Sequence, residues 1–566
     1  MKSQQLSRRA IVFVLALLVT QAGPALLKAQ PFQVPQPQSI SLPIEAQAAT
    51  AFTLDHYAVD ARFTPAEPSS LRGPRLRRMP DHELVPAAVF NRIKAAAAHN
   101  PYAPFDQHAG PYFDQTRGPL TPAPLVKFPG LTDIDGVEPP DMAVAVSPNW
   151  VVQGVNDHWA VFSRAGAVQA SWPKSFANFF HVPSPGSCDP TPFMSDPRAF
   201  YIIPDQRFVL AALQIDGAAI GTSCATLSKY WIAVSKTNNP NGVWNVYSFD
   251  MRAGTTNIAD FTQIGYDANG IYFSGNMFNS AGTAYLYAEI FGAPKSKMEA
   301  GLAVTAKGFL KLKAGGILVD TVQPVDSLTQ PPSTVAPQPV ELFINSKNIL
   351  NCTSVCNGVT VWAFANVLGT PSLTAVSVAT QSYSTPPNAT QPSGLTINTD
   401  DQRINGTPVY QGGLISFGLT TGITHGSSTV AGLFWGQVMP TLSGTKVTGG
   451  SIFQSGFLSF AGDRSAFYPA LVPDSRGDLF IAFGSSSSTL NASAYYAGRK
   501  AADAHGTFQP SLQLLKGGTF YPGARWGDYS AAAIDGNATA SQAWFALEYA
   551  NSIGDWATEI GGTRFP

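Results

Sequence analysis

The chain has 566 residues, a formal net charge of −1, 50 glycines and 45 prolines, and only 13% of it is Asp, Glu, Lys or Arg. This composition disfavours long charged helices and is typical of short strands joined by tight turns. The chain carries no basic stripe of the kind that binds nucleic acid, so we expect no nucleic-acid partner.

Residues 1–29 are predicted to be an export signal peptide. Arg8 and Arg9 precede an apolar stretch at residues 11–19, which is too short to span a bilayer in the mature protein. The paired arginines fit the twin-arginine route as well as the general secretory route, and both alternatives stay open. We therefore expect a secreted or periplasmic protein of bacterial type, with no membrane span.

Residues 30–122 form a segment of different character. It begins Pro-rich and holds one helix-like stretch, residues 85–98, which the Asn100-Pro101 pair terminates. We interpret it as a poorly ordered N-terminal extension. Two arrangements fit it: the extension covers one mouth of the channel expected below, or it hangs away from it.

Residues 123–566 repeat one unit of roughly 50 residues, a period that indicates a propeller or a solenoid. Each unit has an acidic or aromatic first residue, a short apolar strand, a turn and a second apolar strand. A weaker unit follows Pro339, and the clear units begin at Asp141, Asp196, Asp260, Asp401, Phe467 and Asp528. The pattern predicts an all-β, seven-bladed β-propeller, with six or eight blades as alternatives and a parallel β-helix as the rival fold. Because a ring must close, we expect a strand at residues 123–128 to complete the last blade.

The same motifs carry a family resemblance. The stretches PPDMAVAVSPNWVVQGVNDHWAVF, SDPRAFYIIPDQRFVLAAL, IGYDANGIYFSGNMF and ARWGDYSAAAID resemble secreted bacterial β-propeller proteins that are related in fold to sialidases. The resemblance covers about residues 130–566 and implies the fold. It implies no assigned activity, and the relation to sialidases supports only an analogy for function.

Charged residues recur near the starts of four units, which places them at one mouth of the central channel. An arginine fork can clamp a substrate carboxylate, and a sialidase-like hydrolase also needs a tyrosine nucleophile and an acid. The favoured interpretation is structural, with each Asp–Arg pair joining neighbouring blades. The candidate ligand-binding residues are Asp196, Arg198, Asp401, Arg403, Asp463, Arg464, Arg525 and Asp528, and the weaker catalytic candidates are Tyr468, Tyr529 and Glu548.

Two further patterns involve cysteines and a cluster of carboxylates. The four cysteines suit an oxidising compartment, and we choose the pairs Cys188–Cys224 and Cys352–Cys356 among three connectivities. An acidic turn before the first unit has oxygen ligands of the type that calcium prefers. A solvated turn is the favoured reading, and the candidate ligands are Asp133, Asp135, Glu138 and Asp141.

The sequence thus predicts a secreted, monomeric propeller that serves as a binding or scaffold module for extracellular protein or glycan partners. The alternative is a sialidase-like glycoside hydrolase that uses the axial Arg, Asp and Tyr residues. The protein is more readily explained as a non-enzyme, and no cofactor other than calcium is expected.

Overall fold

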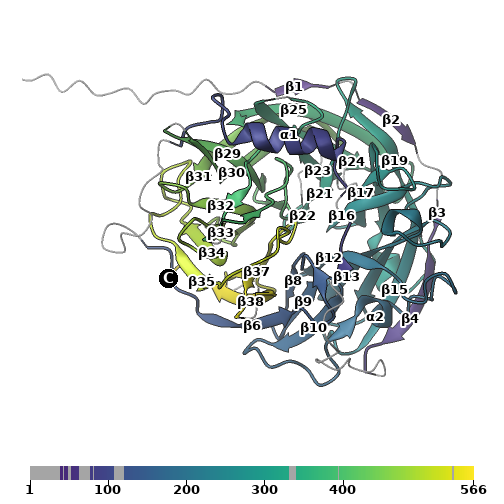
Figure 1. The fold of residues 1–566 in the computed structure, drawn as a ribbon. Helices are drawn as coiled ribbons and strands as arrows, with labels where there is room; N and C mark the ends of the chain where they lie inside the picture. The colour runs from purple at the N-terminus through teal and green to yellow at the C-terminus, as the bar shows by residue number, and fades with distance from the viewer. Residues whose placement is uncertain are drawn as a thin grey trace, which may run out of the picture. The chain divides into compact units, whose positions relative to one another are not determined.

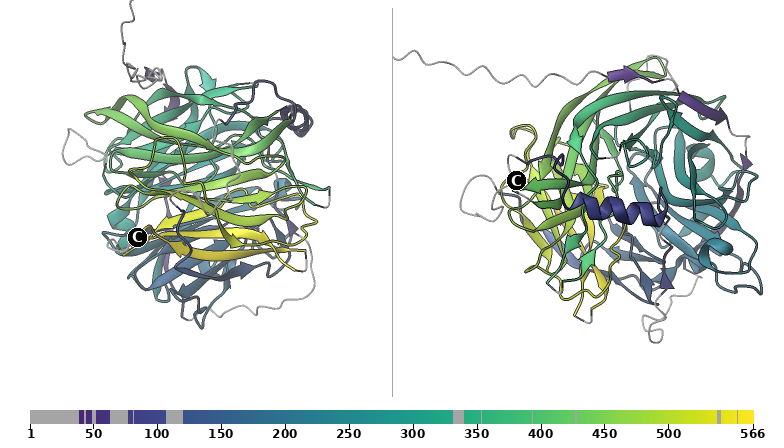
Figure 2. Two further views of the ribbon diagram at one scale, coloured as in Figure 1. Left: turned by 90° about the vertical axis from the view of Figure 1, so that its left-hand side faces the viewer. Right: turned by 45° about the horizontal axis from the view of Figure 1, so that its top comes forward.

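The computed structural model describes residues 39–566 except for 43, 49–51, 63–76, 81, 107–119, 331–339, 353, 393, 427, 538–540 and 553. These residues belong to one compact unit, Pro37–Pro566. The predicted signal peptide lies outside the described residues. Antiparallel sheets dominate this unit and are arranged around a common axis (Figure 1; Figure 2). The all-β prediction and the propeller architecture are therefore confirmed.

The first three repeating units are sheets whose strands follow one another in sequence from the axis outward. The first sheet contains β8 (Ala143–Val146), β9 (Trp150–Val155), β10 (His158–Ser163) and β11 (Lys174–Ser175). The second contains β12 (Met194–Ile202), β13 (Arg207–Asp216), β14 (Leu227–Ser235) and β15 (Val243–Asp250). The third contains β16 (Ile258–Tyr266), β17 (Gly270–Phe278), β18 (Tyr285–Pro294) and β19 (Thr305–Ala314), with β20 (Ile317–Leu318) paired to β19.

The next three units follow the same order. The fourth contains β21 (Gln323–Pro324), β23 (Val340–Ser346), β24 (Cys356–Ala365) and β25 (Ser372–Tyr383). The fifth contains β28 (Val409–Gln411), β29 (Leu414–His425), β30 (Ser428–Ser443) and β31 (Lys446–Leu458), and the short strand β22 (Asp326–Ser327) bridges it to β16. The sixth contains β32 (Ser465–Pro473), β33 (Leu479–Ser486), β34 (Ser493–Arg499) and β35 (Gln513–Lys516).

The last unit closes the ring with a strand from the other end of the repeat region. It contains β36 (Ala531–Ile534), β37 (Ala543–Ala550), β38 (Trp556–Thr563) and then β6 (Val126–Thr132). Strand β6 is antiparallel to β38, with Phe128 opposite Ile560. This pairing confirms the predicted closing strand. It also satisfies backbone groups that an open sheet edge would leave unpaired.

Side-chain size explains how the sheets pack. The innermost strands of the first and last sheets, Ala143–Val146 and Ala531–Ile534, are built from small residues, which suits the place where the sheets converge at the axis. Bulkier side chains of the outer strands fill the wedge between sheets: Trp159 and Phe208, both fully buried, belong to one apolar cluster from the first two sheets. Burial of such aromatic side chains supplies much of the favourable free energy of folding.

The described parts of the N-terminal extension are docked on the propeller by strand pairing. They add strands to the outer edges of three sheets: β1 (Ser39–Ser41) pairs with β25, β2 (Ile44–Ala48) and β3 (Phe52–Thr53) pair with β19, and β4 (Asp55–Asp60) pairs with β15. Next, β5 (Arg77–Arg78) pairs with β7 (Val137–Glu138). The physical reason is that outer edge strands offer unpaired N–H and C=O groups, which the extension satisfies.

The remaining elements are short. The helix expected at residues 85–98 is α1 (Ala87–Ala97), and α2 (Phe176–Phe180), α3 (Lys295–Glu299), the 3-10 helix η1 (Ala218–Ile220) and the β26 (Ala389–Thr390)–β27 (Thr396–Ile397) hairpin lie in loops. The structure contains both predicted disulfides, Cys188–Cys224 and Cys352–Cys356. Among the described residues, no helix combines the length and apolar composition needed to cross a bilayer.

Candidate functional site

The inner strands share a sharp backbone feature near their first residues. Three of them, β12, β16 and β32, have a register shift at this point, which is the signature of a β-bulge. The residue with positive φ is Asp141 (39°), Asp196 (54°), Phe261 (50°), Thr321 (49°), Asp400 (52°) or Tyr468 (53°) in successive units. Bulges redirect side chains, so this repeated feature gathers unlike residues at one mouth of the axis.

These residues with positive φ also connect neighbouring sheets. The backbone amide of Asp196 donates to Asn156 Oδ1 (3.0 Å), and that of Tyr468 donates to Thr420 Oγ1 (2.9 Å). The amide of Thr321 likewise donates to Asn276 Oδ1 (2.7 Å). In each case the acceptor comes from the preceding sheet. At these three positions, neighbouring sheets are thus joined by hydrogen bonds from backbone amides to neutral side chains.

A small polar cavity lies at this mouth. Its volume is about 10 Å³, room for about one water molecule. The cavity brings together residues from several sheets and from the N-terminal extension: Pro80, His82, Asp260, Phe261, Asn398, Asp400, Arg403, Tyr468, Arg525 and Asp528. We call it the axial cavity. Of the candidates named from sequence, it unites Arg403, Tyr468, Arg525 and Asp528.

Both arginines of the axial cavity are paired with carboxylates close to them in sequence. Arg403 donates from Nε and Nη2 to the two oxygens of Asp401 (2.9 and 2.8 Å) and also lies 3.0 Å from Asp400 Oδ2. Arg525 Nη2 donates to both oxygens of Asp528 (2.9 and 3.1 Å). Their guanidinium groups are therefore already neutralised, which argues against a clamp for a substrate carboxylate.

Arg198 is placed differently. It is 4% exposed, and its guanidinium carbon lies 3.4 Å from the ring centre of Tyr529 and 5.6 Å from that of Phe261. Within the described part of the chain, its Nε and Nη2 have no hydrogen-bond partner. Arg198 does not line the axial cavity. The positive charge of Arg198 acts to lower the pKa of the neighbouring Asp196. The effects described below are stronger, and they raise this pKa.

Arg464 and Asp463 lie away from the axial cavity. Arg464 Nε donates to Ser485 Oγ (2.9 Å), and its guanidinium packs on the rings of Phe460 and Tyr495. Asp463 accepts a hydrogen bond from the amide of Ser488 (2.8 Å). Asp463 and Arg464 therefore do not occupy the position that the charged residues of the other units occupy. In the sixth unit the residue with positive φ is Tyr468.

The carboxyl groups around the mouth are held in different protonation states. Burial, followed by the charges of Asp260 and Asp528, raises the pKa of Asp196 to about 7. Burial and the charges of Asp528 and Asp196 raise the pKa of Asp141 well above its ordinary value. Burial also acts to raise the Asp401 pKa, but Arg403 outweighs it, so that this pKa lies below its ordinary value. At neutral pH the mouth thus holds protonated and ionised carboxyl groups together.

The predicted catalytic candidates occupy separate positions. Tyr468 lines the axial cavity and its hydroxyl donates to the Asn398 carbonyl oxygen (3.0 Å). Tyr529 is buried, donates to the Pro197 carbonyl oxygen (3.2 Å), and burial raises its pKa well above the ordinary value. Glu548 accepts from the Gly527 amide (2.7 Å), and burial raises its pKa too. Tyrosine nucleophiles need a neighbouring base to ionise them, and Tyr529 instead faces a carbonyl oxygen.

The four predicted calcium ligands do not converge. Asp133 Oδ1 accepts from the amides of Gly136 and Val137, Glu138 accepts from the Tyr521 hydroxyl, and Asp141 accepts from Asn156 Nδ2. A different set comes together: ligand atoms of Asp135, Asp157 and His158 lie within 4.8 Å of one another. Its imidazole nitrogen departs from the all-oxygen ligand sets that calcium prefers, so calcium at this turn stays a prediction.

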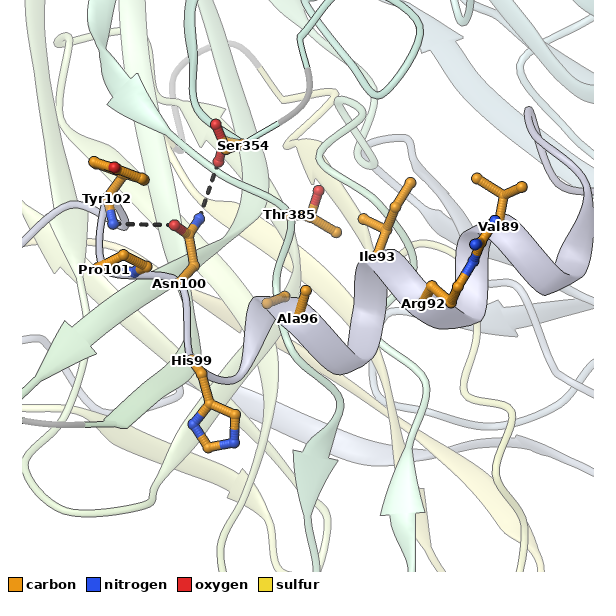
Figure 3. A pocket seen from close by; sticks show the side chains of 11 residues that line it. Val89, Arg92, Ile93, Ala96, His99, Asn100, Pro101, Tyr102, Ser354 and Thr385 are labelled. Atoms are coloured by element: carbon orange, nitrogen blue, oxygen red, sulfur yellow. Dashed lines mark hydrogen bonds between the residues drawn. The ribbon is translucent and has the colours of Figure 1, made fainter.

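A second, larger cavity is an apolar groove along α1 with a volume of about 680 Å³. Figure 3 shows Val89, Ile93 and Thr385 facing it, and the Asn100 amide donating to the Ser354 carbonyl oxygen (3.0 Å). Its described lining residues include no carboxylate. Acid chemistry is therefore available at the axial cavity and not in this groove.

Of the six residues lining the axial cavity that were not site candidates from the sequence, three are titratable: Asp260, Asp400 and His82. Asp260 begins one of the repeating units, so the unit start itself was the signal that could have found it. Asp400 immediately precedes the predicted Asp401. His82 lies in the extension, outside the repeat, and no sequence pattern connects it to the axis.

No protein-family model matches the chain, and no curated protein does. Among solved structures, it is similar to Trypanosoma rangeli sialidase, with 8% identity, 65% of this chain and 54% of that chain covered, and a TM-score of 0.30. It is also similar to Penicillium chrysogenum alpha-L-arabinanase complexed with arabinobiose, with 11% identity, 64% and 94% covered, and a TM-score of 0.32. The chain thus spans about half the length of the sialidase. At these identities and TM-scores the neighbours say nothing of activity, which has to be read from the side chains of the axial cavity.

Proposed function

We propose that the protein is a glycoside hydrolase that acts on neutral glycans at the axial cavity of a seven-bladed propeller. The observation that carries this proposal is the pair Asp196 and Asp260. Asp260 lines the cavity, whereas Asp196 is not among its lining residues. Asp196 Oδ2 accepts from the backbone amide of Thr262 (3.2 Å), two residues after Asp260, and the charge of Asp260 is one of the causes of the raised Asp196 pKa. Glycoside hydrolysis uses two carboxyl groups of this kind.

The protonation states suit a division of roles. With a pKa of about 7, Asp196 carries its proton below neutral pH and would protonate the leaving glycosidic oxygen as general acid. Asp260 would act as the second carboxylate, either attacking the sugar or activating water.

The charge balance favours a neutral substrate. Arg403 and Arg525 are each bonded to aspartates, and Asp260 adds a further carboxylate to the cavity. An anionic sugar would have to displace these ion pairs and would also meet the Asp260 carboxylate. Sugar hydroxyls, in contrast, can donate to carboxylates and accept from guanidinium groups.

Three further features complete the proposal. The seven repeating units correspond to seven blades, the last closed by β6. Two disulfides suit an oxidising compartment, so we place the protein in the periplasm or outside the cell. The protein is expected to act as a monomer on an extracellular glycan.

The test is hydrolysis of a panel of fluorogenic glycosides of neutral pentoses and hexoses, with an N-acetylneuraminic acid glycoside as the anionic comparison. We expect turnover of a neutral glycoside and a loss of at least about a hundredfold in Asp260→Asn. Asp250→Asn, on the outer strand β15, is the matched control. Binding of a sugar without turnover would favour the binding module, and preference for the anionic glycoside would contradict the neutral-substrate proposal.

A further inference from the structure

One segment of the extension crosses the mouth of the axis. We define the strap as residues 79–106, of which Asp81 lies outside the described residues; α1 is its centre, and Figure 1 shows α1 lying across one face of the ring between the labels β29 and β24. At one end the Met79 amide donates to the Glu138 carbonyl oxygen (2.8 Å). At the other end Asp106 accepts from the Ser459 hydroxyl (2.8 Å). The strap is therefore anchored on both sides of the axial cavity.

The first internal contact of the strap is His82. This side chain is 7% exposed, lines the axial cavity, and places Nδ1 3.2 Å from Asp260 Oδ2. Its ring packs against Phe278, with ring centres 5.3 Å apart. Gly282 has a φ of +69°, and a Cβ there would come within 2.4 Å of His82 Nε2. The loop around Gly282 is thus shaped to admit the imidazole.

The second internal contact is Lys94 of α1. Its ammonium group is buried and donates to three oxygens: the carbonyls of Pro386 (2.7 Å) and Asp400 (2.6 Å) and the hydroxyl of Thr399 (2.8 Å). Hydrogen bonds from a charged donor are among the stronger ones in proteins. Because Asp400 also contacts Arg403, this latch lies beside the axial cavity.

We propose that the strap is a gate over the axial cavity, and that His82, which the gate carries, is the positioning residue for Asp260. With the strap seated, the cavity has room for about one water molecule. A sugar can enter only if the strap moves outward. When the strap reseats, His82 fixes the orientation of the Asp260 carboxylate. The gate does not depend on the proposed glycosidase function, whereas the positioning role of His82 rests on it.

The gate is tested with a buried thiol. All four natural cysteines are in disulfides, so Thr399→Cys, at a fully buried position under the strap, supplies a single reactive group for dithionitrobenzoate. This change removes the hydroxyl acceptor of Lys94 and leaves its two carbonyl acceptors, Pro386 and Asp400, so every comparison is made within the Thr399→Cys background. We expect Lys94→Met and His82→Leu each to speed its modification by at least about tenfold, because they release one latch. Arg92→Met, on the exposed side of α1, should leave the rate unchanged.

A second reporter separates gate opening from unfolding. Ser486→Cys places a thiol at a fully buried position of β33, in the sixth sheet, and should stay protected in the latch variants. If Lys94→Met exposes both thiols, Lys94→Gln replaces it as the milder variant. If the Thr399→Cys thiol is modified at the same rate with and without Lys94→Met or His82→Leu, the gate proposal is wrong.

The positioning role is tested by activity on the glycoside that the wild type hydrolyses best. His82→Leu should lower kcat/KM by about tenfold or more and change the shape of the pH profile, whereas His82→Gln, which keeps an N–H donor, should recover part of the loss. His99→Gln, an exposed histidine at the end of the same helix, is the control. An unchanged pH profile in His82→Leu would overturn the positioning role. A wild type without any hydrolysis would overturn it together with the proposed function, while the thiol experiment would still decide the gate.

Discussion

The backbone amide of Asp528 donates a 2.6 Å hydrogen bond to Asp141 Oδ1. Asp141 begins the first repeating unit and Asp528 the last, so this bond joins the two ends of the ring. Asp141 also accepts from Asn156 Nδ2 (2.7 Å) and is 2% exposed. Since Asp528 lines the axial cavity, ring closure and the candidate site depend on the same contact.

Replacing Asp141 should therefore weaken the closed ring. Asp141→Ala removes the acceptor of the Asp528 amide and one of the two acceptors of Asn156 Nδ2, and we expect a loss of about 2–4 kcal/mol in the free energy of unfolding. Asp141→Asn keeps an acceptor oxygen and should lose less. Urea unfolding followed by tryptophan fluorescence measures both, and an Asp141→Ala protein as stable as the wild type would refute the closing role of this contact.

The raised pKa of Asp196 predicts a specific dependence of stability on pH. Its pKa is about 7 in the folded protein against 3.8 ordinarily, so the folded state binds the proton more tightly than the unfolded chain. The stabilisation is fully present below pH 4 and is lost as the pH rises through 7, by roughly 2–4 kcal/mol. Asp196→Asn should flatten this decline between pH 4 and 7 in urea unfolding. A decline as steep as that of the wild type would contradict the shifted pKa.

Arg403 should be costly to remove on its own. Arg403→Met leaves Asp401 buried beside Asp400 without its bidentate partner, and breaking a buried pair costs about 3–5 kcal/mol. The double variant Arg403→Met with Asp401→Asn should recover much of this loss, because no uncompensated charge remains. Thermal unfolding of the three proteins makes the comparison. Equal losses in the single and double variants would show that the ion pair contributes little.

The sequence was sufficient for the architecture, because strand repeats and turn residues are local signals. The starts at Asp141, Asp196 and Asp260 fixed the spacing, and the incomplete last unit required the closing strand, which the structure shows as β6. The docking of the extension was not predictable in this way. Strands such as β1 and β4 are stabilised by sheet edges far away in the sequence, and their own sequence pattern is weak.

The candidate site was predicted only where it coincided with the repeat. Arg403, Arg525 and Asp528 lie at unit starts and do meet at the axial cavity. Arg464 has the same local pattern, but the bulge in its unit falls at Tyr468 instead, so its side chain leaves the axis. His82 reaches the cavity through the path of the strap, which no local pattern encodes.

The two disulfides should differ in their contribution to stability. Cys188–Cys224 closes a loop with a sequence separation of 36, and Cys352–Cys356 one with a separation of 4. Loop-closure entropy predicts losses of about 4 and about 2 kcal/mol when each pair is replaced by serines. Urea unfolding of the two double variants tests this order, which would be contradicted if the short loop proved the more costly one.

The pH dependence of kcat/KM on a neutral glycoside tests the central claim most directly. If Asp196 is the general acid, activity should fall on the alkaline side with a midpoint near pH 7, and Arg198→Met should move this midpoint upward, because the guanidinium charge lowers the Asp196 pKa. Asp260→Asn should abolish turnover while the protein stays folded. Undetectable hydrolysis of every neutral glycoside by the folded wild type, or a profile that Arg198→Met and Asp260→Asn leave unchanged, would contradict catalysis at the axial cavity.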